Sequence, residues 1–178
     1  MAQAMETAGA PEPRGAAQEA ATAEAAGPRQ VVGALIRDRH DRIFVQRRSP
    51  DRRLFPGCWD VVGGAVEDGE SLLDAVRREI AEETGWRLRR VLARVAHGEW
   101  TADGVRHVES DYVVEVDGDL SAPELEWDKH TEFAWIAADD LSPLDENVRC
   151  GAGTFIKDVV TAAHAWLADA SAERREAR

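Results

Sequence analysis

The pattern of apolar and polar positions predicts a chain in which strands outnumber helices. Val31 to Ile36 is an unbroken apolar run typical of a buried strand, and Ile43 to Val45 resumes an extended pattern after a turn at residues 38–41. Val91 to Trp100 and Val105 to Val116 predict two further strands joined by a short polar turn. Shorter strands are predicted at Trp59–Val62 and Phe133–Ile136, with residues 47–57 and the acidic residues 117–132 as loops.

A four-residue spacing of apolar positions predicts a helix from Ser71 to Thr84. Ser71 has the side chain of an N-cap, and Asp74 lies three residues further on, as in a capping box. Gly85 stands where a left-handed C-terminal cap is favoured. A second amphipathic helix is expected near the end of the chain, on the apolar stripe of Phe155, Ile156, Val159, Val160, Ala163, Trp166 and Leu167.

Composition divides the chain into three segments. Residues 1–29 are rich in Ala, Glu, Gly and Pro and contain no aromatic residue, so they cannot bury enough apolar surface to offset the entropy of ordering. We expect them to form a disordered tail. Residues 30–170 are long enough for one folded domain, and residues 171–178 are expected to be a charged C-terminal tail.

The acidic balance of the chain limits its partners. A net charge of −12 repels a phosphate backbone, so no long nucleic acid is expected, whereas a small polyphosphate can be bridged to acidic side chains by divalent cations. No membrane span is expected, because the longest apolar stretch, Phe133 to Ala138, is too short to cross a bilayer. The N-terminus resembles neither a secretory signal nor a transit peptide, so we expect a cytoplasmic protein.

The cysteines and aromatic residues suggest no further chemistry. Cys58 and Cys150 are too few and too isolated to indicate a disulfide framework or a zinc site, and we expect reduced thiols. His97 and His107 are interpreted as ordinary strand residues. The tryptophans at 59, 100, 127 and 135 are interpreted as core residues rather than base-stacking platforms.

Three carboxylates on the predicted helix carry the candidate chemistry. At about 100° per residue, Glu79, Glu82 and Glu83 fall within an arc of roughly 100° and share one helical face. Like charges at this spacing repel each other, so a compensating group is expected. A solvated face paired with nearby arginines would serve, and so would divalent cations, of which Mg²⁺ or Mn²⁺ suits ligation by oxygen alone.

The residues around these glutamates favour the cation. Gly64, Glu70, Arg78, Glu79, Ile80, Glu82, Glu83 and Gly85 match the Nudix box, G-x(5)-E-x(7)-R-E-U-x-E-E-x-G-U, at every interval. Trp86 takes the final position, where an aliphatic residue is usual. The chain therefore resembles the Nudix hydrolases over roughly Val31 to Leu167. This resemblance implies an α/β (α+β) fold, an α/β/α sandwich with a mixed central β-sheet.

The resemblance also implies roles for the box residues. Glu79, Glu82 and Glu83 would hold the catalytic cations, and one of them would orient or deprotonate the attacking water. Glu70 and Arg78 resemble the family's structural ion pair. Gly64 and Gly85 belong to the structural motif, and Gly63 and Gly64 would let backbone approach the metal or the substrate phosphates, although turn glycines explain them equally well.

Outside the box, several side chains are candidates. Arg47 and Arg48 could bind a terminal phosphate of the substrate through bidentate contacts, or one of them could be a solvated strand end. A loop acid often completes such sites, and Glu126, Asp128 and Glu132 are the candidates, of which we favour Glu132 as catalytic. Asp145 stands where MutT-like members carry a base-reading asparagine, with Asn147 close by.

These features predict Mg²⁺-dependent hydrolysis of a phosphoanhydride in a nucleoside diphosphate linked to another group. The leading substrate is a nucleoside triphosphate, including oxidised dNTPs, which would give a monophosphate and pyrophosphate. A nucleotide sugar or a dinucleotide is the alternative, and a Nudix-like binding module without turnover is an alternative of another class. The expected partner is a small nucleotide, and a homodimer is left open.

Overall fold

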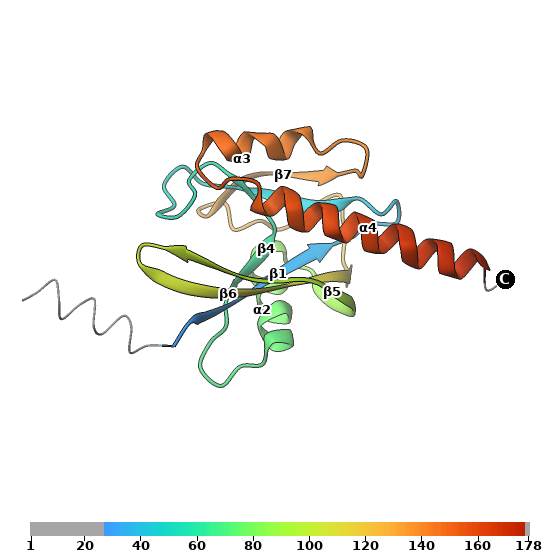
Figure 1. Cartoon of the computed structure of the whole chain (residues 1–178), viewed down its shortest axis with the longest axis horizontal. Coiled ribbons are helices and arrows are strands. Elements are labelled where there is room, and N and C mark those ends of the chain that lie inside the picture. Colours follow the sequence, from blue (N-terminus) through green and yellow to red (C-terminus); the bar gives the residue numbers. More distant parts are fainter. Residues whose placement is uncertain (1–26, 177–178) are drawn as a thin grey trace, which may run out of the picture.

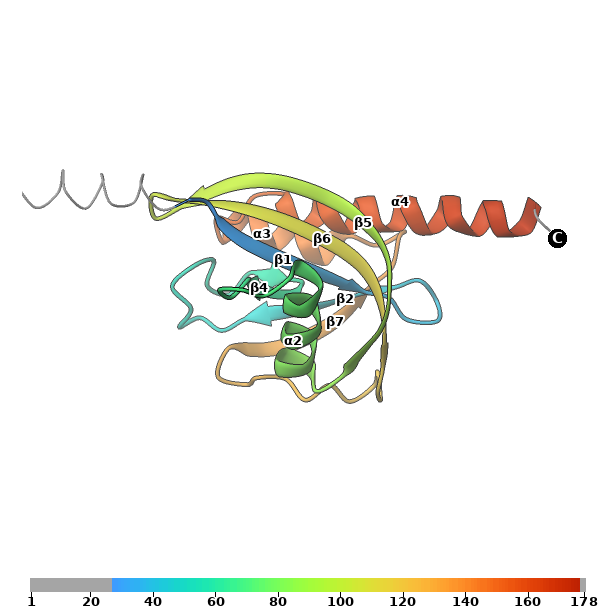
Figure 2. The same cartoon turned by 90° about the horizontal axis from the view of Figure 1, so that it is seen from below.

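The computed structural model describes residues 27–176, and their strands form two sheets. The larger sheet contains β1 (Arg29–Ile36), β4 (Val62–Ala65), β5 (Arg87–Ala102) and β6 (Val105–Asp117) in the order β4-β1-β6-β5. Strands β1 and β6 are parallel, whereas the β1–β4 and β5–β6 pairs are antiparallel, so the sheet is mixed, as predicted. Figure 2 shows β5 and β6 as a long curved hairpin, with register shifts that bend the ladder.

A second sheet, entirely antiparallel, lies beside the first. It contains β2 (Ile43–Arg48), β3 (Trp59–Asp60) and β7 (His130–Ile136) in the order β3-β2-β7. The sequence pattern predicted these strands but not the division into two sheets, because strand pairing depends on tertiary contacts that periodicity does not reveal.

Helices cover both faces of the larger sheet. Figure 1 shows α2 (Leu72–Thr84) on one side of β1 and β6, and α4 (Phe155–Glu176) on the other. Each helix closes its own apolar core, so the α+β fold class is confirmed. Helix α4 extends to Glu176, past the residue where the C-terminal tail was expected to begin, whereas most of the predicted N-terminal tail lies outside the described residues. Within residues 27–176 no helix is long and apolar enough to cross a bilayer.

The ends of α2 agree with the predicted signals. The Ser71 hydroxyl accepts a hydrogen bond from the backbone N–H of Asp74 at 3.1 Å. Gly85 adopts φ 72°, and its N–H donates to the carbonyl of Ala81. These caps satisfy backbone groups that the helix itself leaves free, and they fix the register of the glutamates on its surface.

Cys58 and Cys150 form a disulfide, so the expectation of reduced thiols was wrong. The cysteines are 92 residues apart in sequence, but their Cα atoms lie 5.8 Å apart in the fold. A short helix, α3 (Glu146–Arg149), follows a 3₁₀ turn over Ser142–Asp145 and lies against the segment before β4. The Asn147 amide accepts from the Trp59 N–H and donates to the Trp59 carbonyl, both at 2.8 Å, which holds the two segments together.

Candidate active site

Glu83 is buried where α2 meets the strands of both sheets. Its Oε2 accepts hydrogen bonds from Gln46 Nε2 at 2.6 Å and from the Gly63 N–H at 3.0 Å, and His130 Nε2 lies 3.8 Å from Oε1. Burial, followed by the negative charge of Glu79, raises the pKa of Glu83 to about 8. A carboxylate that is fixed in place but lacks a charge partner is suited to accept a cation.

Glu79 lies one turn earlier on α2, against β4. Its side chain is mostly buried, which raises its pKa, and Arg78 Nη1 donates to Oε1 at 2.7 Å. A Cβ at Gly64 would lie 2.3 Å from that same oxygen, and one at Gly63 would lie 2.1 Å from the Val32 carbonyl oxygen. Both glycines are therefore required for the close packing of β4 against Glu79 and β1, and they are more than turn glycines.

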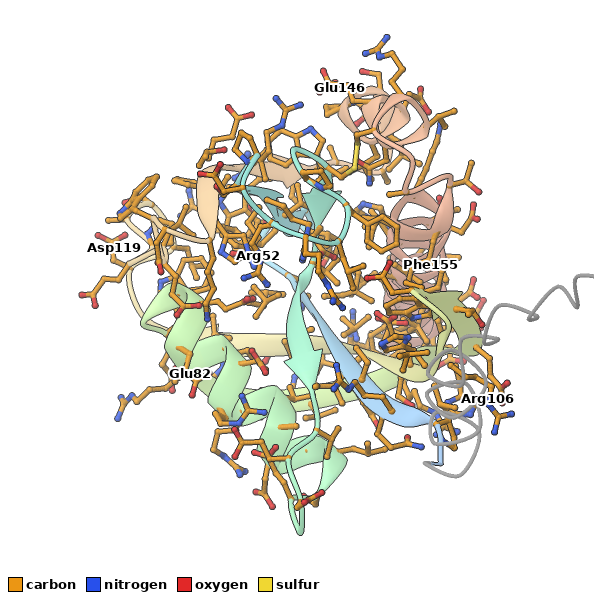
Figure 3. The ribbon with its side chains drawn as sticks, turned by 90° about the vertical axis from the view of Figure 1, so that its left-hand side faces the viewer. Arg52, Glu82, Arg106, Asp119, Glu146 and Phe155 are labelled. Atoms are coloured by element: carbon orange, nitrogen blue, oxygen red, sulfur yellow. A yellow bond between two sulfur atoms is a disulfide. The ribbon has the colours of Figure 1, made fainter. Side chains whose placement is uncertain are left out.

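Arg78 joins the acidic residues of the site. Its guanidinium donates to both oxygens of Glu70 at 3.0 Å, to the Ala65 carbonyl at 3.0 Å and to Glu82 at 3.2 Å, in addition to Glu79. These carboxylates raise the pKa of Arg78, with Glu70 contributing most. The side chain of Glu82 is half exposed, and Figure 3 shows it on the outer side of α2.

Comparison with known proteins decides the family. The NUDIX domain model matches residues 27–159. Nucleoside triphosphatase NudI of Escherichia fergusonii is 35% identical over 133 residues, 67% of this chain and 89% of that protein. The MutT NUDIX hydrolase structure from Burkholderia pseudomallei aligns with a TM-score of 0.57 at 30% identity, covering 71% of this chain and 99% of that one. The chain belongs to the Nudix family. It is a MutT-like Nudix hydrolase, and the MutT protein structure from Methanosarcina mazei Go1 has the same TM-score at 26% identity, covering 69% of this chain and 93% of that one.

The Nudix box has the donor set for a divalent cation. All of its acidic side chains provide hard oxygen ligands, the type that Mg²⁺ and Mn²⁺ prefer. Two of them, Glu79 and Glu83, are buried carboxyls, and burial is the main cause that raises their pKa values. Within residues 27–176 no three acidic, histidine or cysteine side chains are gathered as a metal site, and Arg78 donates to both Glu79 and Glu82. The acidic residues of the box therefore fit a divalent cation that would replace some of the contacts Arg78 makes with Glu79 and Glu82.

Arg47 and Arg48, the predicted phosphate-binding residues, both contact protein acids. Arg47 pairs with Glu146 and, at 3.1 Å, with Glu132, and its guanidinium lies 4.9 Å from the Trp59 ring centre. Arg48 donates to Asp60 at 2.8 Å and to the Leu54 carbonyl at 2.9 Å. Arg52, which the sequence analysis did not single out, lines the same pocket as Arg48.

The three candidate loop acids differ in position. Glu132 pairs across the strands with Arg47 and is half exposed, and Asp128 is exposed. Glu126 lies 2.9 Å from the ammonium of Lys129, and the charge of Lys129 lowers the pKa of Glu79 against the effect of burial. Glu126 and Lys129 thus form an ion pair in the loop before β7.

The residues expected near a base-reading position have structural partners instead. Asp145 lies 2.5 Å from the Lys157 ammonium. Asn147 is buried, and its amide oxygen and nitrogen both bond to the backbone of Trp59. The Asn147 amide therefore holds α3 against β3.

Sequence reasoning missed a second acidic group, formed by Asp60, Glu109 and Asp111. Glu109 and Asp111 follow His107 at alternate positions of β6, a pattern typical of a solvated strand face. In the fold both faces of β6 are covered, so these side chains are buried. The available signal was the acidic residues within an otherwise apolar strand, but only the topology shows that they are enclosed.

These buried acids predict how stability depends on pH in the metal-free protein. Glu83 and Glu109 have folded pKa values of about 8, above the ordinary 4.5, so the folded state holds protons that the unfolded state has lost. Stability should therefore fall as pH rises from 7 to 8.5, by up to about 1.4 kcal/mol per pH unit for each such group. The lowered pKa of His130, about 4, acts in the opposite direction but only below about 6.5.

Thermal unfolding in EDTA across this pH range measures the effect. The melting temperature should decrease with pH in the wild type and decrease less in Glu83→Gln. A melting temperature that stays constant or rises between pH 7 and 8.5 would contradict the burial of unpaired acids.

Proposed function

We propose that the chain hydrolyses nucleoside triphosphates to monophosphates and pyrophosphate with Mg²⁺ or Mn²⁺. The intact Nudix box carries this proposal, since Glu79 and Glu83 are buried carboxyls without a cation of their own beyond Arg78. The choice of substrate is supported by relatives named nucleoside triphosphatase NudI. That of Escherichia coli K12 is 34% identical over 131 residues, which are 67% of this chain and 89% of that protein.

Each residue of the site has a proposed part. Glu79, Glu82, Glu83 and the Gly63 backbone would hold the ions, with Glu126 as the added loop acid. Bound ions would neutralise the phosphates and lower the pKa of the attacking water. Gln46 and the Gly63 N–H fix the orientation of Glu83, so that one carboxylate oxygen is held while the other is free of hydrogen bonds within the described residues.

The phosphate chain would lie near the arginines of the β2–β3 loop. Arg48 and Arg52 line the pocket next to Gly63 and Gly64, and Figure 3 shows Arg52 on the side of the molecule that also presents Glu82. A guanidinium binds phosphate oxygens through paired donors. Arg47 would instead support the pocket from outside, because it stacks on Trp59, which lines the pocket, and pairs with Glu132.

A substrate panel tests the proposal. The full chain is assayed with Mg²⁺ on the common ribo- and deoxyribonucleoside triphosphates, an oxidised dNTP, nucleotide sugars and dinucleoside polyphosphates, and products are separated by chromatography. We expect nucleoside triphosphates to give monophosphate plus pyrophosphate, with activity lost in EDTA. Faster hydrolysis of a nucleotide sugar or dinucleotide, or release of single phosphates, would refute the proposed reaction.

A further inference from the structure

A second cavity, of about 450 Å³, lies between the β1–β2 turn, the β6–β7 loop and strand β7. We call it the β7 cavity. Among the described residues, it has no lining residue in common with the pocket of Arg48 and Arg52. Figure 3 shows Asp119, which lines the β7 cavity, well apart from Phe155, which lines that pocket. A cavity of this volume is in the range of small-molecule binding sites.

Two aromatic side chains form the floor of the β7 cavity. Phe133 and Trp135 are two residues apart on β7, so they lie on the same face of the strand. Their rings lie 5.6 Å and 5.3 Å from the ring of buried Phe44, yet both side chains remain partly exposed. The exposed part of these rings offers a surface on which a planar ring can stack.

The two carboxylates that line the cavity have hydrogen-bond partners within their own turns. Asp38 Oδ1 accepts from the N–H groups of His40 at 2.8 Å and Arg42 at 2.9 Å, and Asp38 Oδ2 accepts from Arg42 Nε at 2.8 Å. Asp119 Oδ1 accepts from the N–H of Ser121 at 2.9 Å and from its hydroxyl at 2.6 Å. These contacts hold the turn and the loop in shape, so the cavity is formed before a ligand binds.

The β1–β2 turn also brings two guanidinium groups to the cavity. The Arg42 guanidinium lies 6.0 Å from the centre of the Trp135 ring, beside the aromatic floor. Arg39 is exposed, and its Nε donates to His40 Nε2 at 2.9 Å, but among the described residues it has no carboxylate partner. Guanidinium groups bind phosphate through paired N–H donors. The β7 cavity therefore combines a surface for a planar ring with donors for an anion.

Trp86 connects the cavity to the Nudix helix. It follows Gly85, the C-cap of α2, and takes the box position where an aliphatic residue is usual. Its Nε1 donates to the carbonyl of Asp119 at 3.0 Å, and its ring is stacked on Trp135 with centres 6.1 Å apart. A ligand in the cavity would therefore contact the two residues that hold Trp86 at the end of the helix.

We propose that the β7 cavity is a second binding site, separate from the catalytic one, for a planar ring that bears a phosphate group, such as a nucleoside monophosphate. The ring would stack on Phe133 and Trp135, and the phosphate would accept hydrogen bonds from Arg39 and Arg42. A ring alone would leave the arginines without a partner, and a phosphate alone would leave the aromatic floor uncovered. The inference goes beyond the proposed function and does not depend on it, because binding here needs no turnover.

The test titrates AMP into the isotope-labelled full chain without metal and follows the tryptophan indole N–H signals by NMR. Trp86 and Trp135 report the β7 cavity, whereas Trp59 reports the pocket of Arg48 and Arg52, which it lines. We expect the Trp86 and Trp135 signals to move and saturate with AMP. Adenosine and inorganic phosphate, tested separately, should bind at least about tenfold more weakly, because stacking and charge-assisted hydrogen bonds each have an effect of this order.

Two substitutions test the parts of the site. Arg39→Ala and Trp135→Leu should each weaken the AMP binding that Trp86 reports at least about tenfold. Arg39 is exposed, so its removal should leave the fold intact. Arg106→Ala is the matched control, because Arg106 is an exposed arginine of β6 that does not line the β7 cavity. It should bind AMP with the affinity of the wild type.

Trp86 and Trp135 signals that stay in place up to about 10 mM AMP would overturn the proposal. An unchanged affinity in a folded Arg39→Ala would do the same, as would adenosine or phosphate that binds as tightly as AMP. The outcome is separable from the proposed function. AMP binding in the β7 cavity without triphosphate hydrolysis refutes only the reaction, and hydrolysis without movement of the Trp86 and Trp135 signals refutes only this site.

Discussion

Replacing Glu83 by glutamine is expected to lower kcat/KM for nucleoside triphosphates at least about 100-fold. Substitution even of groups that only support metal ligands often costs 10- to 100-fold, and Glu83 is proposed to be a ligand itself. The amide is nearly isosteric, so the contact with the Gly63 N–H can persist while the negative charge is lost. Steady-state hydrolysis over a range of Mg²⁺ concentrations measures the change.

Glu67→Gln is the control for this substitution. Glu67 belongs to the loop of the Nudix box, but its side chain is 72% exposed and its nearest contact with Arg78 is 3.9 Å. Its activity should stay within about twofold of wild type. Activity of Glu83→Gln within tenfold of wild type, in a protein that melts normally, would show that Glu83 does not have the assigned role.

Loss of the Cys58–Cys150 disulfide is expected to lower the free energy of unfolding by about 4.6 kcal/mol. A crosslink between residues 92 apart restricts the unfolded chain, and the loop-entropy relation gives a value of this order. For a chain of this size the melting temperature should fall by roughly 10 °C. Urea unfolding and thermal melting with and without a reductant measure the change.

The control is the double variant Cys58→Ser with Cys150→Ser. It should melt near the reduced wild type and should not respond to reductant. Thiol labelling before mass spectrometry checks the bond directly, and two labelled cysteines in the protein purified without reductant would refute the disulfide.

Local signals predicted most of the fold. The caps at Ser71 and Gly85 placed α2 to within one residue, because capping depends on neighbours a few positions away. The spacing of the box glutamates also predicted that they share one helical face, and the resemblance of the flanking residues to the Nudix box made them candidate metal ligands. The caps and the shared helical face both depend on residues that lie within one or two helical turns of each other.

Long-range features could not be predicted in this way. Cys58 meets Cys150 only because α3 packs back onto the strands, and Glu109 and Asp111 are enclosed only because both faces of β6 are covered. The free guanidinium groups expected at Arg47 and Arg48 turned out to contact Glu132, Glu146 and Asp60. Such pairings depend on which strands are adjacent, and hydrophobic periodicity does not indicate which strands lie next to each other.

The Arg78 guanidinium affects how the acidic residues of the Nudix helix are stabilised. It donates to Glu70, Glu79 and Glu82, so its positive charge reduces the repulsion among these carboxylates before a metal ion binds. Folding of the domain therefore need not wait for magnesium. Arg78 competes with an incoming ion for Glu79 and Glu82. The fraction of sites that hold an ion should therefore depend on the ion concentration and on whether substrate phosphates bind the ion as well.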